Sequence, residues 1–294
     1  MAYYTGQAAS YAELLNVFTG YCVVEGWIWT NNVLSKNNIY VGLSASNIGI
    51  VATGYTALTK TNPSAIKPRI GAASSTISLP TFPIDYHIFI FESEIYLITN
   101  FSIDFYHYLA VGDTNPYILD GFWISASSCE LQISTDSRGG YSFDLNASNS
   151  GNNIYQCPTP FGKLNYLSAD WVYNSVILHK LDGGRWSGIS KQAFSTLGIS
   201  PLLSIQPSGW SSDSILIPIP VFIDRASSKK SQVAEFINSR FTRIDNFEPK
   251  QILTFGNDKW MVFPLYKKNI GSRDGGSVID HSGTFGWAIR YDGP

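Results

Sequence analysis

The sequence contains few charged residues: Asp, Glu, Lys and Arg make up 14% of its 294 residues, against roughly 25% in an ordinary soluble domain. Exposed Lys and Glu keep monomers soluble and hinder edge-to-edge pairing of β-strands. Aromatic residues, also 14%, are abundant, and protein interfaces are rich in aromatics and poor in Lys and Glu. The composition favours a protein whose surface becomes covered in an assembly. The alternative is an ordinary β-sandwich with a polar, uncharged surface.

The sequence also lacks a strong net charge, a long apolar run and a recognisable leader. Its net charge is −2, which predicts no general attraction to nucleic acid or to an anionic membrane. No apolar run approaches the roughly 18 residues needed to span a bilayer. Residues 1–15 lack the basic and apolar regions of a signal peptide. We therefore expect a protein that is made in the cytoplasm and works without secretion.

Cysteine and histidine are scarce as well. The three cysteines, Cys22, Cys129 and Cys157, are spaced for neither a disulfide framework nor a metal site, and we expect buried thiols. The four histidines show no metal-binding spacing, and the sequence has neither a Gly-x-Ser-x-Gly elbow nor a phosphate-binding loop. These absences predict a protein that is not an enzyme and has no catalytic residues, no metal and no cofactor.

Several polar residues nevertheless need an explanation. His107 alternates with aromatic residues on a probable strand, which favours a core histidine bonded to the backbone over a ligand. The scattered carboxylates Glu92, Glu94, Asp104 and Asp120 could form a glycosidase pair only if folding joined them. Positions in turns or at strand edges explain these carboxylates better.

The sequence predicts an α+β fold dominated by β-strands, with antiparallel, sandwich-like sheets. Ser10 and Glu13 form a capping box that starts a helix over residues 11–24. A second helix is predicted near residues 228–241, because Val233, Phe236 and Phe241 share one helical face. We expect a single domain over residues 1–294, with a possible extended arm at residues 60–82 and a loop insertion at residues 138–153.

The clearest predicted hairpin joins strands at residues 86–91 and 95–98 through a turn at residues 92–94. Both strands are apolar on both faces, which is typical of central strands covered on two sides. Pro218 and Pro220 interrupt another strand-like run and predict an edge or a segment without ladder bonds.

Some aromatic residues lie in polar surroundings that suit carbohydrate. Trp171, Trp186 and Trp210 are flanked by Asn, Asp or Ser, so their rings could stack on sugars while amides bond hydroxyl groups. The same composition also suits core and interface packing. Glycan stacking on these three residues is therefore an alternative function.

The most distinctive stretch is KWMVFPLYKKN at residues 259–269, followed by a Gly-rich segment and HSGTFGWAIRYD at residues 281–292. It resembles the closing segment of a group of tailed-bacteriophage and prophage virion proteins. The opening YTGQAAS at residues 4–10 and the FYHYL segment at residues 105–109, with Gly112 and Trp123, resemble the same group. The chain departs from the group at Asp120-Gly121, where paired glycines are expected.

The resemblance implies a structural role in the virion tail, in the neck, collar or baseplate. The partners would be other virion proteins, in several symmetric copies, with host surface glycan as a further possibility. Eleven of the 20 Lys and Arg residues lie at or after residue 225, which makes the C-terminal quarter the expected contact region. The predicted partner-binding residues are Trp260, Phe263, Tyr266, Lys267, Lys268, Arg273, Trp287 and Arg290.

Overall fold

Three antiparallel six-stranded sheets and a single helix make up the part of the chain described by the computed structural model. That part comprises residues 1–64, 66–71, 80–101, 105–115, 117, 121–131, 176–178, 195–196, 215–225, 227, 229–265, 268 and 285–293. The predicted α+β class, dominated by strands, is confirmed.

The central sheet has the strand order β1-β7-β8-β9-β10-β12. Its strands are β1 (Ala2–Ala8), β7 (Ile84–Ile90), β8 (Glu94–Phe101), β9 (Phe105–Asp113), β10 (Phe122–Ala126) and β12 (Val176–Leu178). The N-terminal sheet has the order β11-β6-β5-β4-β3-β2. Its strands are β11 (Ser128–Leu131), β6 (Ile66–Gly71), β5 (Gly49–Gly54), β4 (Ile39–Ser46), β3 (Val33–Lys36) and β2 (Ile28–Thr30).

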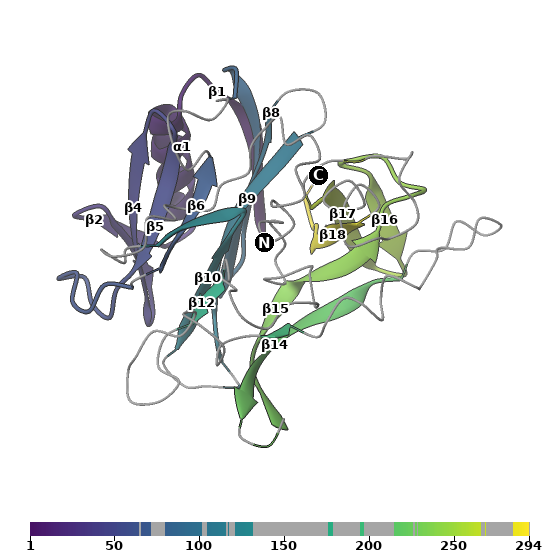
Figure 1. Cartoon of the computed structure of the whole chain (residues 1–294). Coiled ribbons are helices and arrows are strands. Elements are labelled where there is room, and N and C mark those ends of the chain that lie inside the picture. Colours follow the sequence, from purple (N-terminus) through teal and green to yellow (C-terminus); the bar gives the residue numbers. More distant parts are fainter. Residues whose placement is uncertain are drawn as a thin grey trace, which may run out of the picture.

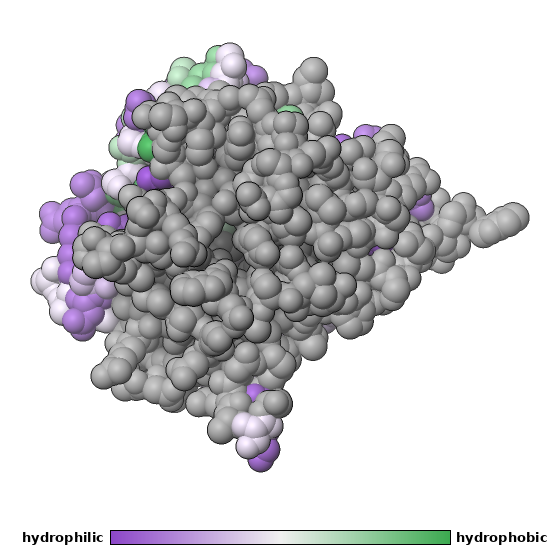
Figure 2. Space-filling model, in the orientation of Figure 1, coloured by the Kyte–Doolittle hydropathy of each residue, from purple (hydrophilic) through white to green (hydrophobic). Residues whose placement is uncertain are grey.

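The C-terminal sheet has the order β13-β14-β15-β18-β17-β16. Its strands are β13 (Ser195–Thr196), β14 (Ile217–Arg225), β15 (Lys229–Arg243), β18 (Phe285–Arg290), β17 (Asp258–Pro264) and β16 (Ile252–Phe255). The turn end of the β14–β15 hairpin projects at the bottom of Figure 1, and the same projection is visible in the space-filling view of Figure 2.

The central sheet is the middle layer of a three-layer stack (Figure 1). One of its faces contributes aliphatic side chains such as Ile88, Leu97 and Val111 to a core shared with the N-terminal sheet and the helix. The other face contributes mainly aromatic side chains, such as Tyr96 and Trp123, to a core shared with the C-terminal sheet. The strands around residues 86–98 are therefore buried on both sides, as their apolar pattern predicts.

The helix α1 (Tyr11–Val24) begins where the capping box predicts. Ser10 Oγ accepts a hydrogen bond from the Glu13 backbone N–H, and Glu13 Oε2 accepts one from Ala9 N–H. Leu14, Phe18 and Cys22 lie on its buried face and enter the aliphatic core. Local capping and apolar spacing agree here, which is why the sequence locates this element correctly.

The helix predicted near residues 228–241 is wrong, because residues 229–241 belong to β15. Two register shifts against β14 produce the misleading spacing. Ile219 pairs with Phe236 while Pro218 pairs with Arg240, so three residues of β15 bulge out between these pairs. Because a bulge reverses the faces of a strand, Phe236 and Phe241 enter the same aromatic core although they lie five positions apart, an offset that puts residues of a regular strand on opposite faces.

Three other expectations change in detail. Residues 66–71, inside the segment predicted as an extended arm, form β6 between β5 and β11. Glu94, predicted in a turn, is the first residue of β8 and is fully buried. Pro218 and Pro220 were predicted at an edge or outside the ladder, but both pair with β15. On the other side of β14, the described pairs with β13 lie at Val221 and Phe222, beyond the prolines. The predicted insertion at residues 138–153 lies outside the described residues.

Candidate functional site

Three of the aromatic side chains predicted to bind a partner, Trp260, Phe263 and Trp287, lie inside the protein. Phe263 and Trp287 face each other across β17 and β18 and belong to the aromatic core. Trp260 is 9% exposed and packs in a third, smaller cluster with Val262 and Ala288. These three side chains stabilise the chain's own sheet, and the partner-binding role predicted for them stays a prediction.

Two of the charged residues predicted beside them, Lys268 and Arg290, bond other groups of the chain. Lys268 Nζ donates to the Phe247 carbonyl at 2.6 Å and to Glu248 Oε1 at 3.1 Å. The exposed Arg290 pairs with Asp258 at 3.3 Å and with Asp292 at 3.7 Å. The other predicted site residues lie outside the described part of the chain: Tyr266, Lys267, Arg273, Trp171, Trp186 and Trp210.

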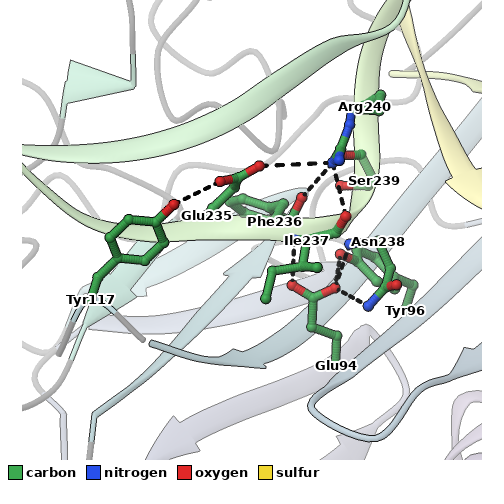
Figure 3. A network of polar contacts seen from close by, with 9 residues as sticks. All are labelled: Glu94, Tyr96, Tyr117, Glu235, Phe236, Ile237, Asn238, Ser239 and Arg240. Carbon is green, nitrogen blue, oxygen red and sulfur yellow. Dashed lines mark hydrogen bonds and ion pairs between the residues drawn. The ribbon is translucent and has the colours of Figure 1, made fainter. Parts of the chain in front are cut away.

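A buried carboxylate, Glu94, is the centre of a polar network between the central and C-terminal sheets (Figure 3). The backbone N–H groups of Ile237 and Asn238 donate to it at 2.7 and 2.8 Å. The Asn238 side-chain amide donates at 2.7 Å and the Tyr96 hydroxyl at 2.9 Å. Ile237 and Asn238 lie in the three-residue bulge of β15, so Glu94 bonds the N–H groups that the ladder leaves unpaired there.

Arg240 supports the same bulge through its carbonyl groups (Figure 3). Its Nη1 donates to the Ile237 carbonyl at 2.8 Å and to the Ser239 carbonyl at 2.7 Å. The guanidinium lies 5.3 Å from the ring centre of Trp260, and Nη1 is 3.9 Å from Glu235, which accepts from Tyr117 at 2.9 Å. The carboxylate of Glu94 and the guanidinium of Arg240 together satisfy the backbone of the bulge.

The network around Glu94 acts as a structural clamp, meaning that it holds the bulge of β15 against the central sheet. Burial raises the pKa of Glu94, and its hydrogen bonds to Asn238, Ile237 and Tyr96 oppose that rise. A general acid or base must reach the proton of a substrate, whereas Glu94 has no exposed surface and its partners are all groups of the chain. Glu94 therefore joins the central sheet to the C-terminal sheet.

A second polar group between these two sheets is His87, on β7. Its Nδ1 lies 2.7 Å from the Tyr3 hydroxyl, and its ring is 5.3 Å from that of Phe263 on β17. Its buried Nε2 has no hydrogen-bond partner among the described residues. Burial and the nearby charge of Lys250 lower the pKa of His87 to about 4, although Asp85 opposes them. His87 is therefore neutral at neutral pH.

The other candidate groups have structural surroundings. His107 is buried, and its Nδ1 accepts the backbone N–H of Gly71 at 3.3 Å, which confirms the predicted core histidine. Cys22 is a buried free thiol, as predicted, and burial raises its pKa. Within the described ranges, no three His, Cys, Asp or Glu residues come together as a metal site, and no helix has the length and apolarity to cross a membrane.

The outer edge of the C-terminal sheet is an accessible apolar feature. Its last strand, β16, exposes 42% of Ile252 and 43% of Phe255. The sequence predicts a strand at residues 251–255, followed by a tight turn at Asn257-Asp258, and the structure confirms the strand as β16. That this strand lies at an exposed edge was not predicted, although residues 251–255 (QILTF) carry no charge.

Two comparisons with known proteins were made, and neither found a relative of this chain. A scan of protein-family models found no match to the chain, and a search of curated proteins found no significantly similar sequence.

Proposed function

We propose that this chain is a structural protein of a bacteriophage virion, part of the tail in the neck, collar or baseplate. It is made in the host cytoplasm and held in the particle by contacts with other virion proteins, in several symmetric copies. The role is binding, without a catalytic step, cofactor or nucleic-acid partner.

The observation that supports the proposal most is the spatial arrangement of the segments that resemble virion proteins. The two halves of the closing motif pair as β17 and β18. The FYHYL segment on β9 packs against them, with Tyr108 4.9 Å from Trp287 between ring centres. At the opening strand, Tyr3 lies 5.1 Å from Tyr291. Segments distant in the sequence thus form one folded unit, as expected if one family architecture underlies them all.

The test is to locate the chain in purified particles. Particles from cells that produce the chain are purified by density gradient, and copies per particle are counted by quantitative mass spectrometry. A fixed copy number, with density at the tail in electron microscopy, supports the proposal. Finding the chain only in the particle-free fraction overturns it.

Host-glycan binding remains the second candidate, resting on Trp171, Trp186 and Trp210, which the structure does not describe. A saturable change of tryptophan fluorescence with host surface polysaccharide, lost when these residues are replaced, would favour that function. A flat titration with particle-bound protein favours the purely structural role.

A further inference from the structure

The strand β16 forms an unprotected edge of the C-terminal sheet. Its four residues, Ile252–Phe255, carry no charge, and no described strand pairs with its outer side. Natural edge strands are commonly protected by charges, prolines or bulges. By contrast, the exposed positions of β1, an edge of the central sheet, are the polar Thr5 and Gln7. β2, an edge of the N-terminal sheet, also exposes an apolar side chain, Ile28, but has only three residues.

Two hydrogen bonds determine which backbone groups of β16 point outward. Val262 N–H donates to the Gln251 carbonyl, so this carbonyl faces β17. Tyr291 N–H donates to the Lys259 carbonyl on the opposite side of β17. Lys259 pairs with Thr254, which makes this a pair without mutual hydrogen bonds. Because these pairs alternate along an antiparallel ladder, the N–H and C=O groups of Ile252 and Thr254 point away from the sheet.

We propose that β16 pairs with β16 of a second copy of this chain, antiparallel and around a two-fold axis at Leu253. Ile252 then lies opposite Thr254 of the second copy, and the symmetry repeats this pair. Each pair exchanges two backbone hydrogen bonds, so all four outward groups of each strand are satisfied. The two C-terminal sheets become one continuous sheet across the dimer, which is strand addition at an exposed edge.

The charges flanking the strand suit this register. In it, Lys250, which precedes the strand and whose N–H bonds the Val262 carbonyl, lies near the turn that leads to the exposed Asp258 carboxylate of the second copy. The symmetry gives two such pairs of opposite charge, and no like charges face each other along the strand. Opposite charges across paired strands are favourable, whereas directly opposed like charges are unfavourable.

The side chains are also compatible with self-pairing. Ile252 faces Thr254, a β-branched pair of the kind that favours strands. Leu253 faces its own copy across the axis, and Phe255 lies opposite Gln251. The two exposed apolar side chains, Ile252 and Phe255, thereby lose solvent contact. Such an interface is small, so we expect a dimer that dissociates on dilution.

Charge substitutions test the register by sedimentation velocity of the full chain over a concentration series. The wild type is expected to shift from monomer to dimer as concentration rises. Replacing both Ile252→Lys and Thr254→Lys places like charges opposite each other and should leave only monomer. Combining Ile252→Lys with Thr254→Glu should restore the dimer, since each introduced lysine then faces an introduced glutamate across the axis.

Cysteine cross-linking tests the two-fold axis. Leu253→Cys places two thiols opposite each other in a pair without mutual hydrogen bonds, at a Cα separation of about 4.5 Å that a disulfide can bridge. Mild oxidation should give a reducible dimer, while the wild type and Thr30→Cys, on the exposed edge strand β2, give only background. Circular dichroism confirms that each variant is folded.

Three results would overturn the proposal: a wild type that stays monomeric at all concentrations, a dimer that survives the double lysine variant, or the absence of a cross-link through residue 253. None of them bears on whether the chain belongs to a virion, because the particle measurement above is independent of the dimer.

Discussion

At the scale of single residues, most buried polar side chains that the structure describes have hydrogen-bond partners within the chain. Glu94 accepts four hydrogen bonds in a site without solvent. Removing the acceptor from such a site costs more than the bond contributed, because the donors remain buried and unpaired. The large stability effects are therefore expected at a few polar positions as well as in the cores.

Replacing Glu94→Ala should lower the free energy of unfolding by about 3–5 kcal/mol, since the N–H groups of Ile237 and Asn238 lose their partner. Chemical denaturation followed by tryptophan fluorescence measures the change. The matched control is Glu92→Ala two residues earlier, whose side chain is 87% exposed and pairs only with Lys36. The control should change stability by less than about 1 kcal/mol. Equal effects of the two variants would contradict the clamp role of Glu94.

Gly112 illustrates a steric requirement at a single position. It pairs with Trp123 across β9 and β10, and a Cβ atom added at Gly112 would lie 2.3 Å from the indole ring. Because Trp123 is fully buried and cannot move aside, Gly112→Ala should destabilise the protein by about 1–3 kcal/mol.

The control for that substitution is Gly20→Ala, on the exposed side of α1, where an added Cβ meets nothing within 4 Å. Alanine favours a helix over glycine by about 1 kcal/mol. The same mutation should therefore stabilise at residue 20 and destabilise at residue 112 in thermal unfolding. Two shifts of the same sign would refute this assignment.

At the scale of the element, β15 is an irregular strand whose bulge is held from two sides. Glu94 binds the N–H groups of the bulge, and Arg240 binds its carbonyl groups. The sequence predicts a helix here because apolar residues recur at three- to five-residue intervals, which is also what a bulged strand produces when its faces reverse. Only pairing with β14 and β18 distinguishes the two, and those partners are tertiary contacts.

If the bulge is one cooperative unit, Glu94→Gln and Arg240→Met should be energetically coupled. We expect a double-mutant cycle to give a coupling free energy of about 1 kcal/mol, because each substitution loosens the segment that the other residue holds. The reference cycle combines Glu94→Gln with Ser10→Ala, an N-cap substitution that should cost about 1 kcal/mol by itself. In that reference cycle, the changes in unfolding free energy from Glu94→Gln and Ser10→Ala should add to within about 0.5 kcal/mol. Coupling no larger than in that reference cycle would show that the two residues act independently.

At the scale of the whole molecule, the central sheet is the middle layer, and each of its faces packs in a separate core. Burial on both sides encloses titratable groups between the layers, among them His87 between β7 and β17. Since burial lowers the pKa of His87 to about 4 and of His107 to about 3, both are neutral in the folded protein at pH values where the unfolded chain binds protons. Stability should be full above pH 6.5 and fall as the pH decreases toward these values.

Between pH 7 and pH 5, His87 alone should account for a loss of about 2 kcal/mol, because the unfolded form gains most of a proton over this range and the folded form does not. Urea unfolding at several pH values measures the loss. His87→Gln should remove that share of the pH dependence while His107 retains its own. Parallel pH curves for the wild type and the variant would rule out this role for His87.

The sequence alone determined the features that depend on neighbouring residues. These are the strand-dominated class, the capped helix at residues 11–24, the doubly apolar strands near residues 86–98 and the core position of His107. Caps, turns and alternation are local, so their physical causes can be read from adjacent positions.

Tertiary structure decided what depends on distant segments. It determined that residues 229–243 form a bulged strand, that Glu94 is a buried clamp, that Phe263 and Trp287 belong to the protein's own core, and that β16 is the exposed edge. Whether a side chain is covered depends on the surface that folds over it, and a strand is an edge only when no other strand pairs with its outer side.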